Sequence, residues 1–574
     1  MSNLRSSEWF SGDDEVSLSH RVVMASIGHE IDVNNSKPII GIADSSSDLN
    51  PCNLPLRGFI PEIERGILEA GGIPVAFPVM SLGEDLMKPS AMLYRNMLSM
   101  EVEEYLRSYP LDGVVLLANC DKSVPGALMG AISTDLPTIM FTAGARPVAQ
   151  FRGKPIGTGT DLWRMWSDYR AKKISEEQWK EFEGCLNCGL GSCNTMGTAS
   201  SVAMMVEALG LTLPGTSVIP ENDPARKVAA FNSGREIVKM VNDQVIPSKI
   251  LTPAAFRNAM RVLHACGGST NAILHLLAIS GRVEGGLTLD AINELATGLA
   301  VIADVEPSGA KLIQDFNQAG GLPALIANMG EVFELDEPTL IGKSWREVVK
   351  GVTPTNKTIR TLSDPIYPKG AFAVVKGNLA PNGAVIKVSA ASKELLSHTG
   401  PAVVFHGYAD MRTRIDDPTL NITKDSVLVL RDCGPVGVPG MPEWGMIPVP
   451  KRLIEAGVND MVRISDARMS GTSFGTCVLH VAPESAVGGP LALVQDGDLI
   501  KLDVDSASIE LLVSDSELQA RRDNWKAPVS QHLRGWPALY QAHVMQADLG
   551  CDLDFLRPKS KLERKFMPPV VGRS

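Results

Sequence analysis

The sequence has few aromatic residues, no long hydrophobic run and no excess of positive charge. Phe, Trp and Tyr make up 5% of its 574 residues, and the formal net charge is −11. Nucleic acids and anionic membrane surfaces select clustered Lys and Arg, so the acidic balance argues against both as partners. No apolar stretch approaches the roughly 18 residues that suggest a membrane span. A small molecule fits better as the partner.

Signal-peptide features and a dense cysteine framework are also lacking. The start "MSNLRSSEWFSGDDEVS" has neither a basic first segment nor an apolar centre, and we therefore expect a cytoplasmic protein. Nine cysteines are dispersed along the chain, which indicates reduced thiols with a role in metal binding or reactivity. The histidines include no HExxH pair, so no zinc-protease helix is indicated.

Short apolar runs alternate with helical stretches in the first part of the chain. The runs "KPIIGIAD", "GGIPVAFPV", "DGVVLLANC" and "DLPTIMFTAG" are rich in β-branched residues, and such alternation predicts a mainly parallel sheet with a helical cover. From about residue 202 to 329 the pattern becomes helical. The composition becomes Gly- and Pro-rich near residue 370, and strand-like runs such as "PAVVFHG" and "SVLVLRDCG" follow. We predict an α/β N-terminal domain over 1–370 and a β-rich, barrel-like C-terminal domain over 371–574.

Three cysteines lie in polar loops that contain Gly or Pro. Cys52 stands in "DLNPCNLPLRG", Cys120 in "ANCDKSVPG" and Cys193 in "GLGSCNTMGTAS". The first two follow apolar runs, and sites in parallel sheets gather beyond the carboxyl ends of strands. Three loop thiols can bind an iron-sulfur cluster or zinc if the fold brings them together. Spacing alone leaves open that they are three unrelated buried cysteines.

The strongest local cysteine signal is "CLNCGLGSC", which contains Cys185 and Cys188 in a Cys-x-x-Cys pair. Such a pair is typical of zinc and redox motifs. No second pair or matching His follows at zinc-finger spacing, so the local motif is incomplete.

Ordered motifs along almost the whole chain resemble the dihydroxy-acid and sugar-acid dehydratase family. "CNTMGTAS" and "SDARMSGTSFGT" are more similar to its sugar-acid branch, which acts on acids such as L-arabinonate and D-xylonate. The other matching stretches are "PCN", "GGIPVAFPVMSLGEDLMKPSAMLYRN", "CDKSVPGALMGA", "GGSTNAILHLLAI", "GNLAPNGAVIK", "GPVGVPGMPEWGM" and "HVAPESAVGGPLA".

The resemblance implies a 2Fe-2S cluster held by Cys52, Cys120 and Cys193, with one iron left open. An open Lewis-acidic iron can accept a departing hydroxyl group. Cys185 and Cys188 lie outside this three-cysteine pattern. We expect that replacing both leaves the cluster and the activity largely intact, because a fourth thiolate would close the open iron.

The resemblance also implies a Mg²⁺ site, with Mn²⁺ as an alternative ion, at Glu84, Asp121, Lys122 and Glu443. Lys122 would be carbamylated by CO₂, which turns a cation into a hard oxygen ligand. Without the resemblance, Glu84 and Glu443 are solvated loop carboxylates and Asp121 with Lys122 is a surface pair.

Ser470 in "SDARMSGTS" matches the serine that this family uses as an alkoxide base. A serine hydroxyl is a weak base, so a nearby cation must hold its deprotonated form. Thr472 can orient either the substrate or this serine. From spacing alone, Ser470 is a turn residue before Gly471.

The function that these residues imply is dehydration of a sugar acid, or a related 2,3-dihydroxy carboxylate, to a 2-keto-3-deoxy acid. The alternative in the same family is the dihydroxy-acid dehydratase of branched-chain amino-acid biosynthesis. A different class of function is an iron-sulfur sensor, which needs no carboxylates around a second metal. The resemblance further implies a homodimer or homotetramer.

Overall fold

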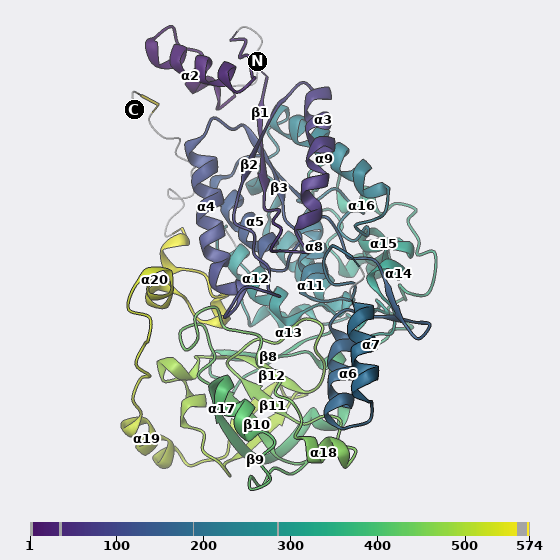
Figure 1. Cartoon of the computed structure of the whole chain (residues 1–574), viewed down its shortest axis with the longest axis vertical. Helices are drawn as coiled ribbons and strands as arrows, with labels where there is room; N and C mark the ends of the chain where they lie inside the picture. The colour runs from purple at the N-terminus through teal and green to yellow at the C-terminus, as the bar shows by residue number, and fades with distance from the viewer. Residues whose placement is uncertain (1–3, 34–36, 187–188, 284–285, 559–570, 573–574) are drawn as a thin grey trace.

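The chain folds into an α/β part followed by a barrel-like sheet, which occupy the upper and lower halves of Figure 1. The structure is a computed structural model that describes residues 4–33, 37–186, 189–283, 286–558 and 571–572. Both halves of the predicted fold class are confirmed. Among the described residues, no helix is long and apolar enough to cross a membrane.

The upper half is built on a four-stranded parallel sheet in the order β2-β1-β3-β4. Strand β3, "GVVLL", is buried at every residue, as expected for an apolar strand covered on both faces. The strands are β1 (Ile39–Asp44), β2 (Ile73–Pro78), β3 (Gly113–Leu117) and β4 (Thr138–Phe141).

Helices lie on both faces of this sheet (Figure 1). α3 (Ile60–Glu69) packs on α9 (Ala225–Asn242), and α4 (Arg95–Ser108) packs on α5 (Ser123–Thr134). The crossing of α4 and α5 depends on Gly130, because a Cβ there would lie 2.4 Å from the Ser99 carbonyl oxygen. Close packing of α5 fixes the direction in which its N-terminus points, and that end begins directly after Lys122.

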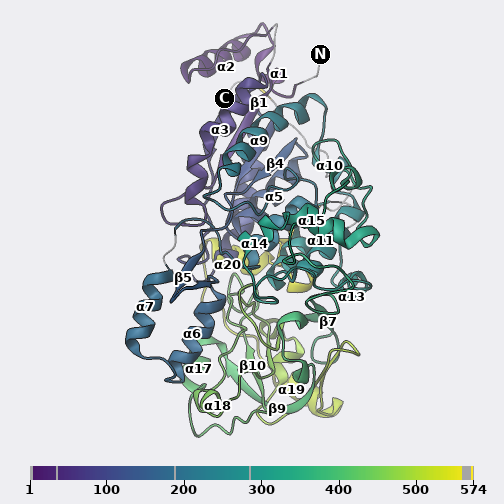
Figure 2. The ribbon, with the colours of Figure 1, turned by 90° about the vertical axis from the view of Figure 1, so that its right-hand side faces the viewer.

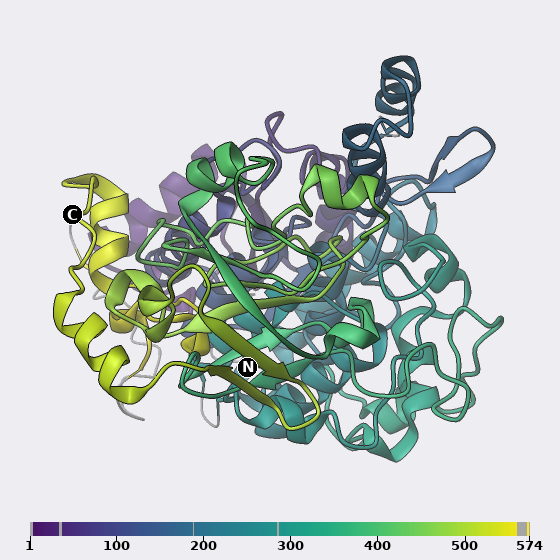
Figure 3. The same ribbon diagram turned by 90° about the horizontal axis from the view of Figure 1, so that it is seen from below.

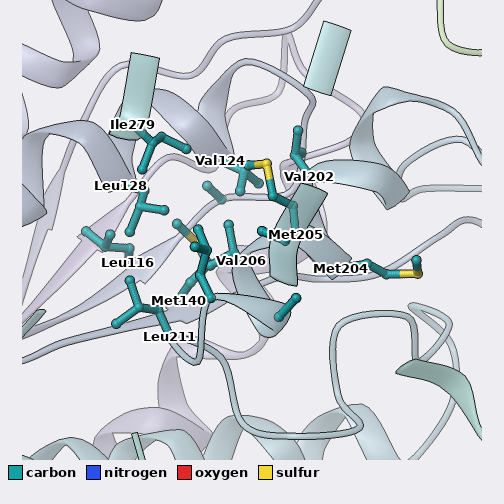
Figure 4. Packing of buried hydrophobic residues seen from close by; sticks show 14 of the residues in the cluster. Leu116, Val124, Leu128, Met140, Val202, Met204, Met205, Val206, Leu211 and Ile279 are labelled. Atoms are coloured by element: carbon teal, nitrogen blue, oxygen red, sulfur yellow. The ribbon is translucent and has the colours of Figure 1, made fainter. Parts of the chain in front are cut away.

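The helical segment predicted near residues 202 to 329 is confirmed. Its central helices, α8 and α12, are buried along their whole length. Figure 4 shows the core that they form with β3 and α5, in which Leu116, Leu128, Val206 and Ile279 gather. The helices of this segment are α8 (Thr198–Ala208), α9, α10 (Pro247–Ile250), α11 (Pro253–Cys266), α12 (Thr270–Ser280), α13 (Ala291–Leu295), α14 (Ile313–Gln318) and α15 (Gly321–Met329).

The lower half is an eight-stranded sheet in the order β14-β13-β9-β10-β11-β12-β8-β7. Its middle strands, from β9 to β12, are parallel, and the outer pairs are antiparallel. A bridge between Lys376 and Ser508 joins the two edge strands, so the sheet curls into a barrel. The strands are β7 (Ala373–Val375), β8 (Gly383–Ile386), β9 (Ser397–His406), β10 (Val427–Arg431), β11 (Arg463–Ser465), β12 (Cys477–Ala482), β13 (Leu499–Asp503) and β14 (Ser508–Leu511).

Alternate side chains of these strands fill two separate cores. Val404 and Val429 belong to the cluster shared by all strands of the barrel, whereas Phe405 and Leu430 pack with Met411 of the neighbouring helix α17. This division follows the two-residue period of a strand. The helices outside the barrel are α17 (Gly407–Arg414), α18 (Lys451–Glu455) and α19 (Asp515–Asn524).

Two segments depart from this simple division. Helices α6 (Thr160–Arg170) and α7 (Glu176–Leu186), with the hairpin of β5 (Ala149–Phe151) and β6 (Lys154–Ile156), project sideways from the body (Figures 2 and 3). After the barrel, α20 (Gly535–His543) returns to the upper half, where the Trp536 indole donates a hydrogen bond to the Leu93 carbonyl. The division at residue 370 stays a prediction. The remaining helices are α1 (Ser7–Phe10), α2 (Glu15–Ser26) and α16 (Trp345–Val348).

Candidate active site

Most of the predicted site residues lie on loops that follow the carboxyl ends of strands in both halves, whereas Cys193 lies between helices α7 and α8. Cys52 follows β1, Glu84 follows β2, and Asp121 follows β3, as predicted for polar loops of a parallel sheet. Glu443 follows β10 and Ser470 follows β11 of the barrel. A site assembled from these loops therefore lies where the carboxyl ends of the parallel strands of the two sheets meet.

Lys122 is the centre of a buried acidic cluster. Its amine lies 2.7 Å from Asp121 Oδ2, 2.9 Å from Glu84 Oε2 and 2.9 Å from Glu443 Oε1. The lysine side chain is fully buried, and the side chains of Glu84 and Glu443 are 21% and 16% exposed. One carboxylate oxygen of each acidic residue lies within 4.8 Å of the others. Neither glutamate is a solvated loop carboxylate, and Asp121 with Lys122 is not a surface pair.

A second layer of buried polar side chains holds the carboxylates. Arg468 donates to Glu443 Oε1 at 2.9 Å and to Ser90 Oγ at 2.8 Å, and Ser90 in turn donates to Glu84 Oε1 at 2.9 Å. The Asn271 amide donates to Glu443 Oε1 at 2.7 Å. One guanidinium thus ties together a carboxylate from each half of the molecule.

The charges of this cluster perturb one another strongly. Burial raises the pKa of Glu84, against the opposing effect of the Lys122 charge. Burial also acts to raise the pKa of Glu443, but Lys122 and Arg468 outweigh it and lower that pKa to about 2. Burial acts to lower the pKa of the Lys122 amine, yet the three carboxylates raise it overall. As an unmodified amine, Lys122 is a cation that compensates part of the negative charge.

The loops of the three predicted cysteines are held by two buried asparagines. Asn53 Oδ1 accepts the backbone N–H groups of Asn119, at 3.1 Å, and Cys120, at 2.8 Å. The Asn119 amide donates to the Cys52 carbonyl at 2.8 Å. The third loop joins through the Gly191 N–H, which donates to the Pro51 carbonyl at 3.0 Å. These bonds fix the backbones of all three loops relative to one another.

The thiol of Cys52 influences the pKa values of both Cys120 and Cys193. A hydrogen bond with Cys52, together with burial, raises the pKa of Cys120. Burial raises the pKa of Cys193 to about 12, with Arg146 opposing and Cys52 adding to the effect. One zinc ion would bring its sulfur ligands within about 4 Å of each other. In the described part of the chain, the three sulfurs are not all within 4.8 Å of one another.

The loop that carries Ser470 packs, at Gly471, against the N-termini of two buried helices. A Cβ at its neighbour Gly471 would lie 2.5 Å from the Thr198 nitrogen of α8 and 2.8 Å from the Ser269 Cβ, the N-cap of α12. Ser470 Oγ lies 3.0 Å from Thr472 Oγ1 and 3.4 Å from the Thr472 backbone nitrogen, which donates to it. Helix N-termini and N–H donors stabilise negative charge. The surroundings of Ser470 Oγ therefore suit an anionic oxygen.

Comparison with known proteins decides the family. Residues 37–348 match the model described as Dihydroxy-acid/6-phosphogluconate dehydratase N-terminal, and residues 357–551 match its C-terminal counterpart. The chain belongs to this dehydratase family.

Relatives in this dehydratase family are similar over nearly their full length. An L-arabonate dehydratase of Azospirillum brasilense is 47% identical over 566 residues, covering 96% of this chain and 97% of that protein. A 6-deoxy-6-sulfo-D-gluconate dehydratase of Pseudomonas putida is 46% identical, covering 96% of each chain. A dihydroxy-acid dehydratase of Methanobrevibacter smithii is 36% identical, covering 93% and 97%. The chain is a dehydratase, a hydro-lyase, as the sequence predicts.

Most of the remaining cysteines of this dehydratase are buried packing residues, and one lies on the projecting helix α7. Cys266, Cys433, Cys477 and Cys551 are fully buried, as expected for thiols that act as small hydrophobes. Cys185 is half-buried near the end of α7. Cys188 lies outside the described residues, so the role of the Cys-x-x-Cys pair stays a prediction.

The sequence does not indicate several polar residues that support this dehydratase site. Asn53, Asn119, Arg468 and Asn271 each lie inside or beside a motif that marks the resemblance. Asn and Arg in a polar loop are ordinary surface residues by pattern alone. Their burial, and the long sequence separations that their hydrogen bonds span, become visible only in the folded chain.

Proposed function

We propose that this dehydratase converts a sugar acid with hydroxyl groups on C2 and C3 into a 2-keto-3-deoxy acid. The observation that carries the proposal is the buried cluster of Glu84, Asp121, Lys122 and Glu443 beside the cysteine loops. Two relatives at 46% and 47% identity carry sugar-acid names, and one at 36% carries the dihydroxy-acid name. This difference favours the sugar-acid branch.

The donor sets fit the cofactors that the resemblance implies. Cys52, Cys120 and Cys193 would hold a 2Fe-2S cluster, since hydrogen bonds frame their loops and the Cys52 and Cys120 thiols lie within hydrogen-bond contact. Glu84, Asp121 and Glu443 offer the hard oxygen atoms that Mg²⁺ or Mn²⁺ prefers. A carbamate on Lys122 would replace the cation at their centre by another oxygen ligand. When bound, these groups supply Lewis acidity to the carboxylate and hydroxyl groups of the substrate.

The protein's own part in the reaction is to move one proton and to orient the substrate. Ser470 Oγ, as an alkoxide, takes the proton from C2, and the electron pair of that C–H bond forms the C2–C3 double bond. The C3 hydroxyl leaves as hydroxide, which with the proton on Ser470 amounts to one water. The enol that remains tautomerises to the 2-keto acid. The Thr472 N–H, which donates to Ser470 Oγ, stabilises the charge on that oxygen before the step.

The other functions make different demands on the same site. An iron-sulfur sensor has no use for a buried cluster of three carboxylates and a lysine, and these residues therefore favour catalysis over sensing. A dihydroxy-acid substrate would be short and branched, and would need an apolar wall where a sugar acid needs hydrogen-bond partners. Assembly as a homodimer or homotetramer and a cytoplasmic location stay predictions.

The test of the proposal is an anaerobic activity screen of protein reconstituted with iron, sulfide and Mg²⁺. Formation of 2-keto acid would be followed with a panel of five- and six-carbon aldonates and with 2,3-dihydroxyisovalerate. We expect kcat/KM to be highest for an aldonate. A preference for the branched acid would place the protein in the dihydroxy-acid branch, and no product from any acid with the cluster intact would overturn the proposal.

Removal of the Asn53 side chain should release the cysteine loops. Asn53→Ala leaves the N–H groups of Asn119 and Cys120 buried without an acceptor, at about 1–3 kcal/mol for each group. We expect less bound iron per chain and a weaker visible absorbance after reconstitution. Asn258→Ala is the matched control, because Asn258 is equally buried and bonds both backbone polar groups of Glu334, away from the site. Equal iron loss in both variants would contradict a specific role of Asn53.

A further inference from the structure

Helix α6 touches the loop that carries Ser470. The indole Nε1 of Trp163 donates to Thr472 Oγ1 at 3.2 Å, and Thr472 Oγ1 lies 3.0 Å from Ser470 Oγ. Trp163 belongs to the pair of helices that projects from the body in Figure 3. Three side chains from two distant segments thus form one line of hydrogen bonds that ends at Ser470.

The chemistry of these groups sets the direction of the line. An indole N–H only donates, so Thr472 Oγ1 must accept from Trp163. An alkoxide only accepts, so once Ser470 has lost its proton, the single hydroxyl proton of Thr472 must point to Ser470 Oγ. A hydroxyl that accepts one hydrogen bond is polarised into a better donor in the next. Each link of the line therefore favours negative charge on Ser470.

The start of α6 is built for this approach. Gly159, just before the helix, has a φ of +89°, and a Cβ there would lie 2.4 Å from Thr472 Oγ1. The Thr160 hydroxyl donates to the Thr472 carbonyl at 3.1 Å. One turn further on, Arg164 pairs with Glu306 at 2.9 Å. Gly159 and Thr160, which precede Trp163, are thus held against Thr472, and Arg164 is fixed by Glu306.

We propose that Trp163 is a positioning residue that acts on Ser470 through Thr472. Its indole keeps the Thr472 hydroxyl turned so that it donates to the Ser470 alkoxide. The inference rests on the proposed function, in which Ser470 is the base, and it extends that function to a residue on a different element.

The kinetic test uses Trp163→Phe, which keeps an aromatic ring and removes the N–H donor. We expect kcat to fall about tenfold, the change that corresponds to loss of one hydrogen bond, with KM changed less than twofold. The kinetic isotope effect with aldonate deuterated at C2 should increase, because proton transfer becomes slower relative to the other steps. Trp166→Phe is the control: Trp166 lies on the same helix, is 43% exposed and packs near Tyr169 and Trp179. Its kcat should stay within twofold of the wild type.

A double-mutant cycle separates this role from simple contact with the substrate. If Trp163 acts through Thr472, Trp163→Phe should have almost no further effect in a Thr472→Val background. If the two substitutions lowered kcat additively, or if Trp163→Phe raised KM with kcat unchanged, the proposal would be overturned. Trp163 would then be a residue that only contacts the substrate.

A crystal structure of Trp163→Phe gives a readout that does not depend on turnover. We expect the Thr472 side chain to rotate away from Ser470 Oγ. An unchanged Thr472 rotamer, still 3.0 Å from Ser470 Oγ, would overturn the inference even if the substrate were wrongly assigned. A wild type that turns over no acid, together with a rotated Thr472 in the variant, would instead refute the proposed function alone.

Discussion

Replacing Ser470 by alanine should lower kcat about a thousandfold while leaving the metal content unchanged. The side chain is the one proton acceptor that we assign to the reaction, and general-base catalysis contributes about 10²- to 10⁴-fold. KM should change little, because the alanine removes no group that binds the resting substrate. The measurement is steady-state turnover on the best aldonate, with iron and magnesium determined in the same preparation.

Ser473→Ala is the matched control for this variant. Ser473 lies on the same loop and is buried, and its backbone N–H donates to the Ser470 carbonyl at 3.0 Å. It should retain most of the turnover. If Ser470→Ala kept kcat within tenfold of the wild type with both metals bound, another group would be the base.

The strands and their order of appearance could be predicted because the sequence signal is local. Runs such as "GVVLL" are apolar throughout, and burial on both faces selects that composition. The same logic located the site: a polar loop that follows such a strand must lie at the carboxyl edge of the sheet. The loops of Cys52 and Cys120 are placed at that edge in this way, whereas the metal-ligand role of Glu84, Asp121 and Lys122 comes from the family resemblance.

Residues whose role depends on distant partners could not be predicted in the same way. By sequence pattern, Arg468 is one charged residue in a loop. No local feature indicates that it bonds to Ser90, which lies 378 positions away in the sequence. Trp163 lies on a helix that also carries Trp166 and Tyr169, a composition that by itself indicates aromatic packing. The contacts of Gly159, Thr160 and Trp163 with Thr472, visible only in the folded chain, show that the helix reaches the site. The return of α20 to the upper half likewise depends on contacts across more than 400 residues.

Replacing Lys122 by methionine should abolish turnover and destabilise the metal-free protein. Methionine is similar in length but has no amine, so it leaves Glu84, Asp121 and Glu443 buried without their shared cation. Breaking a buried ion pair on one side typically costs about 3–5 kcal/mol. We expect a lower urea midpoint at pH 7 in the presence of a chelator. The variant also lacks the amine that the proposed carbamate needs, so Mg²⁺ and CO₂ should not restore activity.

Lys387→Met shows whether this loss is due to the acidic cluster or simply to removal of a buried lysine. Lys387 is 1% exposed, and its amine donates to the Gly267 carbonyl at 2.7 Å. Burial lowers its pKa to about 7, so at pH 7 about half of the Lys387 amine is neutral. Among the described residues it has no carboxylate partner that its removal would leave unpaired. We expect a loss of about 1 kcal/mol, as for one hydrogen bond, and retained turnover. Equal destabilisation by the two variants would contradict the view that Lys122 offsets the charge of three carboxylates, because only Lys122 has acidic groups on every side.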